Sequence, residues 1–243
     1  EMDFDALEAE FKGGAKLFFL CNPHNPVGRV WSRDELEKVA ELCVRYEVLV
    51  VSDEIHSDLI LGGFTHIPLA SLGKEIADLT LTCMAPSKTF NLAGLSTSSM
   101  VISNKSLREK FNKQIESLHI SGGNIFGTEA SIAAYEEGDE WLDQLLHYLH
   151  SNVDYLVNRL NSSQTGIVPI RPEATYMIWL DCKALGMDGT NLGKFFIEQA
   201  GIGMNEGSMF GPGGEGYMRM NLACPRSIIE KAMDKIENAI SKI

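Results

Sequence analysis

The sequence lacks the features that mark membrane, exported and disulfide-bonded proteins. No apolar run approaches the roughly 18 residues that suggest a membrane span, and the N-terminus lacks the basic and apolar regions of a signal peptide. The five cysteines are scattered and form no C-x-x-C pair, so neither a disulfide framework nor a metal site is indicated. These absences favour a reduced, cytoplasmic protein with no metal ion and no membrane partner.

Basic residues are also scarce. Lys and Arg number 21 against 33 Asp and Glu, which gives a formal net charge of −12. No Lys/Arg-rich run offsets that charge, so nucleic acid is not expected as a partner. Hydrophobic residues make up 44% of the 243 residues, which is enough for a chain of one or two domains to bury a core.

The first half of the sequence alternates strand-like and helix-like segments. A capping box of Ser32 and Glu35 begins a helix, and apolar residues then recur at helical spacing up to Cys43. Short apolar runs predict strands at residues 17–21, 48–52, 79–84 and 98–102. Strands joined through a helix form parallel pairs, so we expect an α/β fold with a mainly parallel sheet.

The second half changes character after a long helical stretch. Residues 128–160 show a helical pattern that breaks at Gly138, and a helix of this length suits a connection between domains. Strands are expected at residues 176–180 and 217–222, with helices at 192–200 and from 227. We therefore expect a large domain over residues 1–160 and a smaller α+β domain over residues 161–243.

Polar clusters follow three of the predicted strands, at residues 22–28, 53–58 and 86–91. Ligands of open α/β sheets bind beyond the carboxyl ends of the strands, so these clusters are candidates for one site. Lys88 follows an apolar strand, where its amine could form a Schiff base with a carbonyl group. A solvated surface lysine is the ordinary alternative.

Three further residues fit a site for pyridoxal 5′-phosphate (PLP). Asp53 ends an apolar run and could hold the proton on the pyridine nitrogen, although an acid there is often a helix N-cap. Asn25 could donate to the phenolic oxygen of the cofactor, or could simply form a turn. Arg219 lies inside an apolar strand and needs a partner, which could be a substrate carboxylate or a structural salt bridge.

Four motifs in order carry a family resemblance. The sequence N-P-H-N-P-V-G, S-D-E-I-H, S-K-T-F-N and R-M-N resembles the class I/II aminotransferase-like superfamily of fold-type I PLP enzymes. Within it, the chain is most similar to the MalY/PatB-type cystathionine β-lyases, through residues 53–58, 85–91, 136–149 and 173–176. A histidine, His56, stands where many aminotransferases carry tyrosine, and Ser87 is the remaining local candidate for the cofactor phosphate.

This resemblance implies a reaction. Lys88 would hold PLP and remove the Cα proton, while Arg219 would bind the substrate carboxylate. Cystathionine or a related cysteine S-conjugate would be cleaved to pyruvate, ammonia and a thiol. Two alternatives stay open, which are a PLP-dependent aminotransferase and a ligand-sensing regulator that keeps the fold.

Members of the family begin with a segment that supplies a phosphate-binding loop, a ring-stacking aromatic residue and part of the sheet. The chain starts just before the first motif, so we expect a C-terminal fragment of an enzyme that forms a homodimer when full length. On its own, the 243-residue chain is expected to bind PLP weakly and to lack lyase activity.

Overall fold

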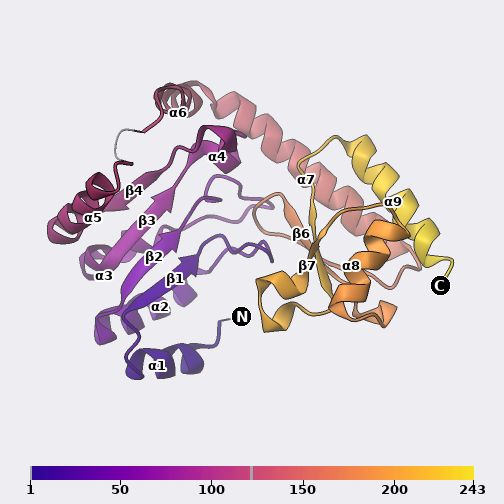
Figure 1. The fold of residues 1–243 in the computed structure, drawn as a ribbon, viewed down its shortest axis with the longest axis horizontal. Helices are drawn as coiled ribbons and strands as arrows, with labels where there is room; N and C mark the ends of the chain where they lie inside the picture. The colour runs from indigo at the N-terminus through magenta and orange to yellow at the C-terminus, as the bar shows by residue number, and fades with distance from the viewer. Residues whose placement is uncertain (1, 121–122) are drawn as a thin grey trace. The chain divides into compact units, whose positions relative to one another are not determined.

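The computed structural model describes residues 2–120 and 123–243, which divide into two compact units (Figure 1). The first unit comprises Glu1–Pro23, Val30–Ile60 and Thr65–Asp143, and the second comprises His24–Arg29, Leu61–Phe64 and Gln144–Ile243. The assignment of residues 1–160 and 161–243 to two domains stays a prediction. In the described part of the chain, no helix is both long and apolar enough to cross a membrane.

A four-stranded sheet in the order β1-β2-β3-β4 forms the centre of the first unit. The strands are β1 (Leu17–Cys21), β2 (Leu49–Asp53), β3 (Thr80–Met84) and β4 (Ser99–Ile102). The first three are parallel and β4 runs antiparallel to β3. The expected α/β class with a mainly parallel sheet is therefore confirmed, and each predicted strand lies within one residue of its observed bounds.

Helices flank this sheet and supply much of its core. They are α1 (Phe4–Lys12), α2 (Arg33–Tyr46), α3 (Lys74–Leu79), α4 (Pro86–Thr89), α5 (Lys105–Ser117) and α6 (Ile125–Glu137). The predicted capping box begins α2, since the Glu35 amide donates to Ser32 Oγ at 3.3 Å and the Ser32 amide donates to Glu35 Oε2 at 2.9 Å. Apolar residues of α2, among them Leu36 and Cys43, are fully buried against β1 and β2. The amphipathic pattern of α2 thus fixes its buried face.

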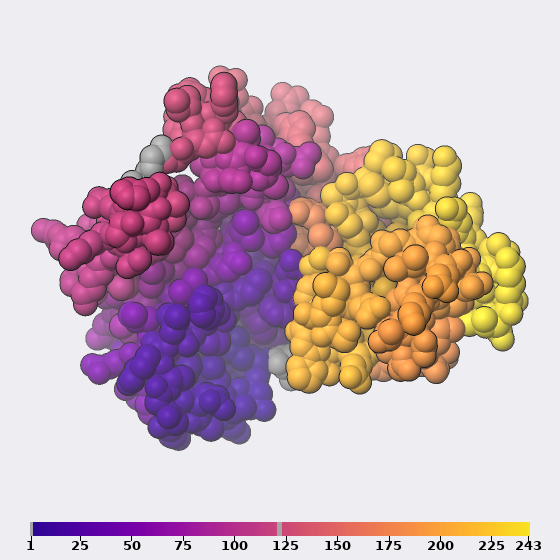
Figure 2. All heavy atoms as spheres, in the orientation of Figure 1, coloured from indigo at the N-terminus to yellow at the C-terminus, as the bar shows by residue number. Residues whose placement is uncertain are grey.

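The first unit also leaves large apolar side chains in contact with solvent. On the edge strand β1, Phe19 is 71% exposed, and at the start of α6 Ile125 and Phe126 are 79% and 78% exposed. Figure 2 shows α6 at the molecular surface. An unpaired strand edge and exposed apolar residues favour association with another surface.

The second unit contains an antiparallel sheet in the order β5-β6-β8-β7. Its strands and helices are β5 (Val168–Ile170), β6 (Met177–Asp181), β7 (Asn205–Glu206), β8 (Tyr217–Asn221), α8 (Gly189–Glu198) and α9 (Arg226–Ile240), together with most of α7 (Asp139–Ser162). Short 3-10 helices are η1 (Leu69–Leu72) and η2 (Ala93–Leu95) in the first unit, and η3 (Lys183–Leu185), η4 (Gly207–Phe210) and η5 (Pro212–Gly214) in the second. The predicted α+β character and the predicted break at Gly138 agree with these elements.

A buried amide of α7 organises the connection between β8 and α9. Asn152 is fully buried, and its Nδ2 donates to the carbonyl oxygens of Leu222 and Cys224 at 3.0 and 3.1 Å. Its Oδ1 accepts from Arg226 Nε at 2.9 Å. One side chain therefore satisfies polar groups at both ends of this loop.

Replacing Asn152 by alanine is expected to lower the free energy of unfolding by about 3 kcal/mol, because buried carbonyl groups and a guanidinium lose their partner. Asn158→Ala removes the same group from an exposed position of the same helix, so it is the matched control, with an expected change below about 0.5 kcal/mol. Urea denaturation of both variants measures the difference. Equal effects would show that the Asn152 hydrogen bonds do not stabilise this connection.

Candidate active site

Lys88 lies in the first unit on α4, a short helix that begins at Pro86, two residues after β3 ends. Its side chain is half-buried. Within the described part of the chain, its ammonium group makes no hydrogen bond and no ion pair. A partly desolvated amine without a partner is suited to covalent attachment to a carbonyl compound.

Asp53 ends β2, between two cysteines of the neighbouring strands. The register aligns Cys21 and Cys83 with Asp53, so the three side chains share one face at the carboxyl ends of the strands. Asp53 is exposed, and its Oδ1 accepts from the Ile55 amide at 3.2 Å. Burial raises the pKa of the Cys83 thiol, and the charges of Asp53 and Glu54 raise it further. The Cys83 thiol therefore stays protonated at neutral pH and adds no charge beside Asp53.

A buried network lies directly after Asp53. Glu54 is 1% exposed, and its Oε1 accepts from Ser52 Oγ at 2.8 Å and from the Leu69 amide at 3.2 Å. Its Oε2 lies 2.9 Å from His66 Nε2. The sequence did not point to Glu54 or His66 as partners, because 12 residues separate them and no periodic pattern joins them. These bonds fix the backbone that carries Asp53.

The two other predicted residues of the first unit differ in exposure. His56 is 3% exposed, and its backbone carbonyl accepts from the Leu59 amide at 3.0 Å. Ser87 is half-buried next to Lys88, and its backbone carbonyl accepts from the Leu92 amide at 3.1 Å. Both roles toward the cofactor stay predictions.

Arg219 and Asn25 meet within the second unit, although 194 residues separate them in sequence. Arg219, on β8, donates through one terminal nitrogen to Asn25 Oδ1 at 3.0 Å and through the other to Asn205 Oδ1 at 2.8 Å. Its guanidinium carbon lies 4.6 Å from the centre of the Phe210 ring. Its Nε is buried and finds no hydrogen-bond partner among the described residues, and burial lowers the pKa of the guanidinium. Both amide partners are neutral, so the positive charge is not neutralised by them and a carboxylate would satisfy it.

Gly28 fixes the loop that carries Asn25. Its φ is +76°, and a methyl group on its Cα would lie 2.6 Å from Pro172 Cβ. Its carbonyl accepts from the amides of Glu173 and Ala174 at 2.8 and 2.9 Å. The turn predicted for residues 22–28 therefore has a second purpose, which is to hold Asn25 in place against the chain around residue 173. Asn25 Nδ2 keeps its hydrogens free of partners in the described residues, as donation to a ligand requires.

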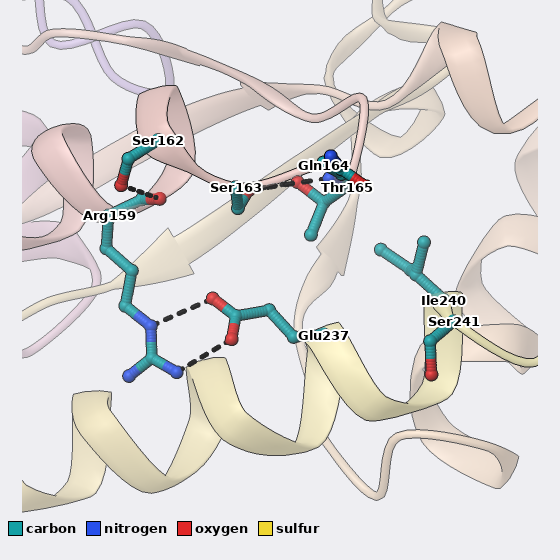
Figure 3. Close-up of a pocket in the computed structure, with 8 residues that line it drawn as sticks. All are labelled: Arg159, Ser162, Ser163, Gln164, Thr165, Glu237, Ile240 and Ser241. Atoms are coloured by element: carbon teal, nitrogen blue, oxygen red, sulfur yellow. Dashed lines mark hydrogen bonds and ion pairs between the residues drawn. The ribbon is translucent and has the colours of Figure 1, made fainter.

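One hollow of the second unit is lined by none of these residues. A cavity of about 480 Å³ lies beside Arg159, Glu237 and the 162–165 turn (Figure 3). Arg159 donates to both carboxylate oxygens of Glu237 at 2.8 Å, to Asp234 at 2.6 Å and to the Tyr155 hydroxyl at 2.7 Å. Since these groups satisfy the guanidinium, Arg159 does not offer a ligand a free positive charge in this cavity. No group of three or more metal-ligating side chains occurs among the described residues.

Comparison with known proteins then decides the family. Residues 1–236 match the family model described as "Aminotransferase class I and II". The chain belongs to this family. It is 41% identical over 241 residues to the cystathionine β-lyase PatB of Bacillus subtilis and 37% identical over 244 residues to the protein MalY of Escherichia coli, with 99% of the chain covered in both cases. The chain spans 62% of the length of each of these relatives.

A solved structure gives the same result for the fold. The PLP-bound C-S lyase of Staphylococcus hominis superposes with a TM-score of 0.90 at 37% identity, covering 99% of this chain and 61% of that protein. The predicted resemblance to MalY/PatB-type proteins is thus confirmed. The chain spans only part of the length of these relatives, as expected.

Proposed function

We propose that the chain is the Lys88-bearing part of a PLP-dependent carbon–sulfur β-lyase that cleaves cystathionine or a related cysteine S-conjugate. The observation that carries this proposal is the unpaired, half-buried Lys88 on α4, in a chain 41% identical to a cystathionine β-lyase over 241 residues. The products would be pyruvate, ammonia and a thiol.

The residues of the first unit fit PLP. Lys88 would hold its aldehyde carbon, and Asp53, the acidic residue at the end of β2, would hold a proton on its pyridine nitrogen. Ser87 would contact its phosphate, and His56 would support the ring. When bound, PLP supplies an electron sink for the negative charge that develops at Cα of the substrate.

In the second unit, Asn25 would use its free Nδ2 to donate to the phenolic oxygen while its Oδ1 accepts from Arg219. Arg219 would bind the substrate carboxylate, which would give the buried Nε a partner and neutralise the charge.

The proposed roles of these residues define the proton transfers. The ε-amine of Lys88 accepts the proton from Cα, the Cβ–S bond breaks, and the sulfur leaves as a thiolate that takes up a proton. Hydrolysis of the remaining three-carbon unit gives pyruvate and ammonia. We further propose a cytoplasmic homodimer, in accord with the absence of any disulfide among the cysteines of the described residues and with the exposed apolar surface of the first unit.

Product analysis of the full-length protein tests the function. With L-cystathionine, pyruvate and homocysteine are expected to form in equal amounts and without 2-oxoglutarate. Added 2-oxoglutarate should not accelerate the reaction. Glutamate as the dominant product would instead assign the protein as an aminotransferase.

Arg219→Lys tests the carboxylate role. Lysine keeps the positive charge but loses the planar pair of donors, so KM is expected to rise about 10- to 100-fold while PLP stays bound. Arg171→Lys makes the same change at an exposed position of the second unit and is the matched control, with KM unchanged. An unaltered KM in Arg219→Lys would show that this side chain does not bind the substrate.

A further inference from the structure

The short helix that carries Lys88 cannot fix its own orientation. Helix α4 contains four residues, and its N-cap residue, Ala85, makes no side-chain capping bond. A single turn of helix is unstable in isolation, because nucleation fixes several residues for one hydrogen bond. Tertiary contacts of the neighbouring residues must therefore set the direction of Lys88.

One such contact comes from the segment that follows Asp53. Thr89 is fully buried, and its Oγ1 donates to Asp58 Oδ2 at 2.9 Å. Asp58 lies in the turn region after β2, five residues beyond Asp53. This hydrogen bond directly joins the segment that carries Asp53 to the residue next to Lys88.

Aromatic packing holds Phe90, which follows Thr89 and caps the C-terminal end of α4. The Phe90 ring contacts Tyr135 with centroids 5.5 Å apart and Trp141 with centroids 5.8 Å apart. A methyl group on Gly138 would lie 2.5 Å from Phe90 Cε1, so only glycine leaves room for this ring. The Gly138 and Trp141 motif thus limits the movement of Phe90.

Asp58 has unusual surroundings for a half-buried carboxylate. Among the described residues it forms no ion pair, and its side chain accepts only from the Thr89 hydroxyl. Its charge contributes, after burial, to the raised pKa of Tyr135. Removing a carboxylate from water costs free energy, and a hydrogen bond from one hydroxyl group offsets only part of that cost. The Asp58–Thr89 bond therefore calls for a role other than stability.

We infer that Asp58 is a positioning residue that orients Lys88 through its hydrogen bond to Thr89. This inference deepens the proposed function and depends on it. The packing of Phe90 and the Asp58–Thr89 bond both act at the C-terminal end of α4, directly after Lys88. Loss of the bond frees α4 to rotate, which displaces the Lys88 amine from the proton that it must accept.

Thr89→Val and Asp58→Ala test this in the PLP-loaded full-length protein. Valine has the shape of threonine without the hydroxyl, and we expect kcat to fall about 10- to 100-fold with KM within about 2-fold. The visible circular dichroism of the bound cofactor should change in both variants, since it reports the orientation of the cofactor–lysine adduct. The double variant should be no worse than either single variant, because one bond is lost in all three.

Two controls keep the test specific. Thr89→Ser retains the hydroxyl and should keep more than half of kcat. Asp78→Ala removes a half-buried carboxylate of the same unit that pairs with Lys74, and it should leave kcat and the circular dichroism unchanged. If Thr89→Val and Asp58→Ala lower only the thermal stability, with kcat and circular dichroism unchanged, the inference is wrong although the proposed function stands. If Thr89→Val does not fold, the kcat and the circular dichroism of Asp58→Ala decide between the same outcomes. If the unaltered protein forms no cofactor adduct at all, the proposed function and this inference fail together.

Discussion

Replacing Lys88 by alanine is expected to abolish the covalent attachment of PLP and to lower kcat at least about 10³-fold. The structure gives the reason, because the Lys88 amine is half-buried and makes no hydrogen bond or ion pair in the described part of the chain. The substitution removes both the point of attachment and the base that accepts the Cα proton. Added small amines should restore part of the activity, since they replace the missing group.

Lys105→Ala is the matched control for this experiment. Lys105 begins α5 in the same unit, its side chain is 80% exposed, and its nearest acid, Glu109, lies 3.8 Å away. The absorbance band of the lysine-bound cofactor and the rate of pyruvate release are measured in both variants. A Lys88→Ala protein that keeps the band and the rate would show that another amine holds the cofactor.

Asp53→Asn is expected to lower kcat about 10²- to 10³-fold while leaving PLP attached to Lys88. Asparagine preserves the shape of the side chain but removes the negative charge that would keep the pyridine nitrogen protonated. The Cys83 thiol aligned with Asp53 cannot replace it, because burial raises the pKa of Cys83 and a protonated thiol carries no charge.

The control here is Asp181→Asn, which neutralises an aspartate at the end of strand β6 in the second unit. Rates of pyruvate release and the cofactor absorbance are compared between the two variants. A normal kcat in Asp53→Asn would assign the pyridine nitrogen to a different partner.

Local signals predicted most of the elements in these two units. The Ser32–Glu35 capping box and the apolar spacing after it fixed the start of α2, and apolar runs bounded by polar clusters located β1 to β4. The elements that were not predicted are mostly short. Helix α4 has four residues, β5 has three and β7 has two, and such lengths leave too few positions for a periodic pattern. Helices α1 and α5 are longer and were also missed. The side chains of Asp3 and Asn104, which accept from the Ala6 and Leu107 amides, were usable N-cap signals.

In the candidate site, too, some residues were predicted from the sequence and others were not. Lys88, Asp53, Asn25 and Arg219 were found through strand ends and motif order, both of which are properties of the sequence. Their partners were not, because contacts such as Arg219 with Asn205, or Glu54 with His66, depend on the folded backbone. Phe210, which lies against the Arg219 guanidinium, was missed for the same reason.

Borohydride reduction of the PLP-treated full-length protein, followed by tryptic mass mapping, tests the central claim most directly. Trypsin does not cleave after a modified lysine, so attachment at Lys88 predicts one labelled peptide that spans residues 75–105. A pyridoxyl phosphate group on that peptide, and on no other, is the expected result. Label on any other lysine, or no stable label, would contradict the assignment of Lys88 as the residue that holds the cofactor.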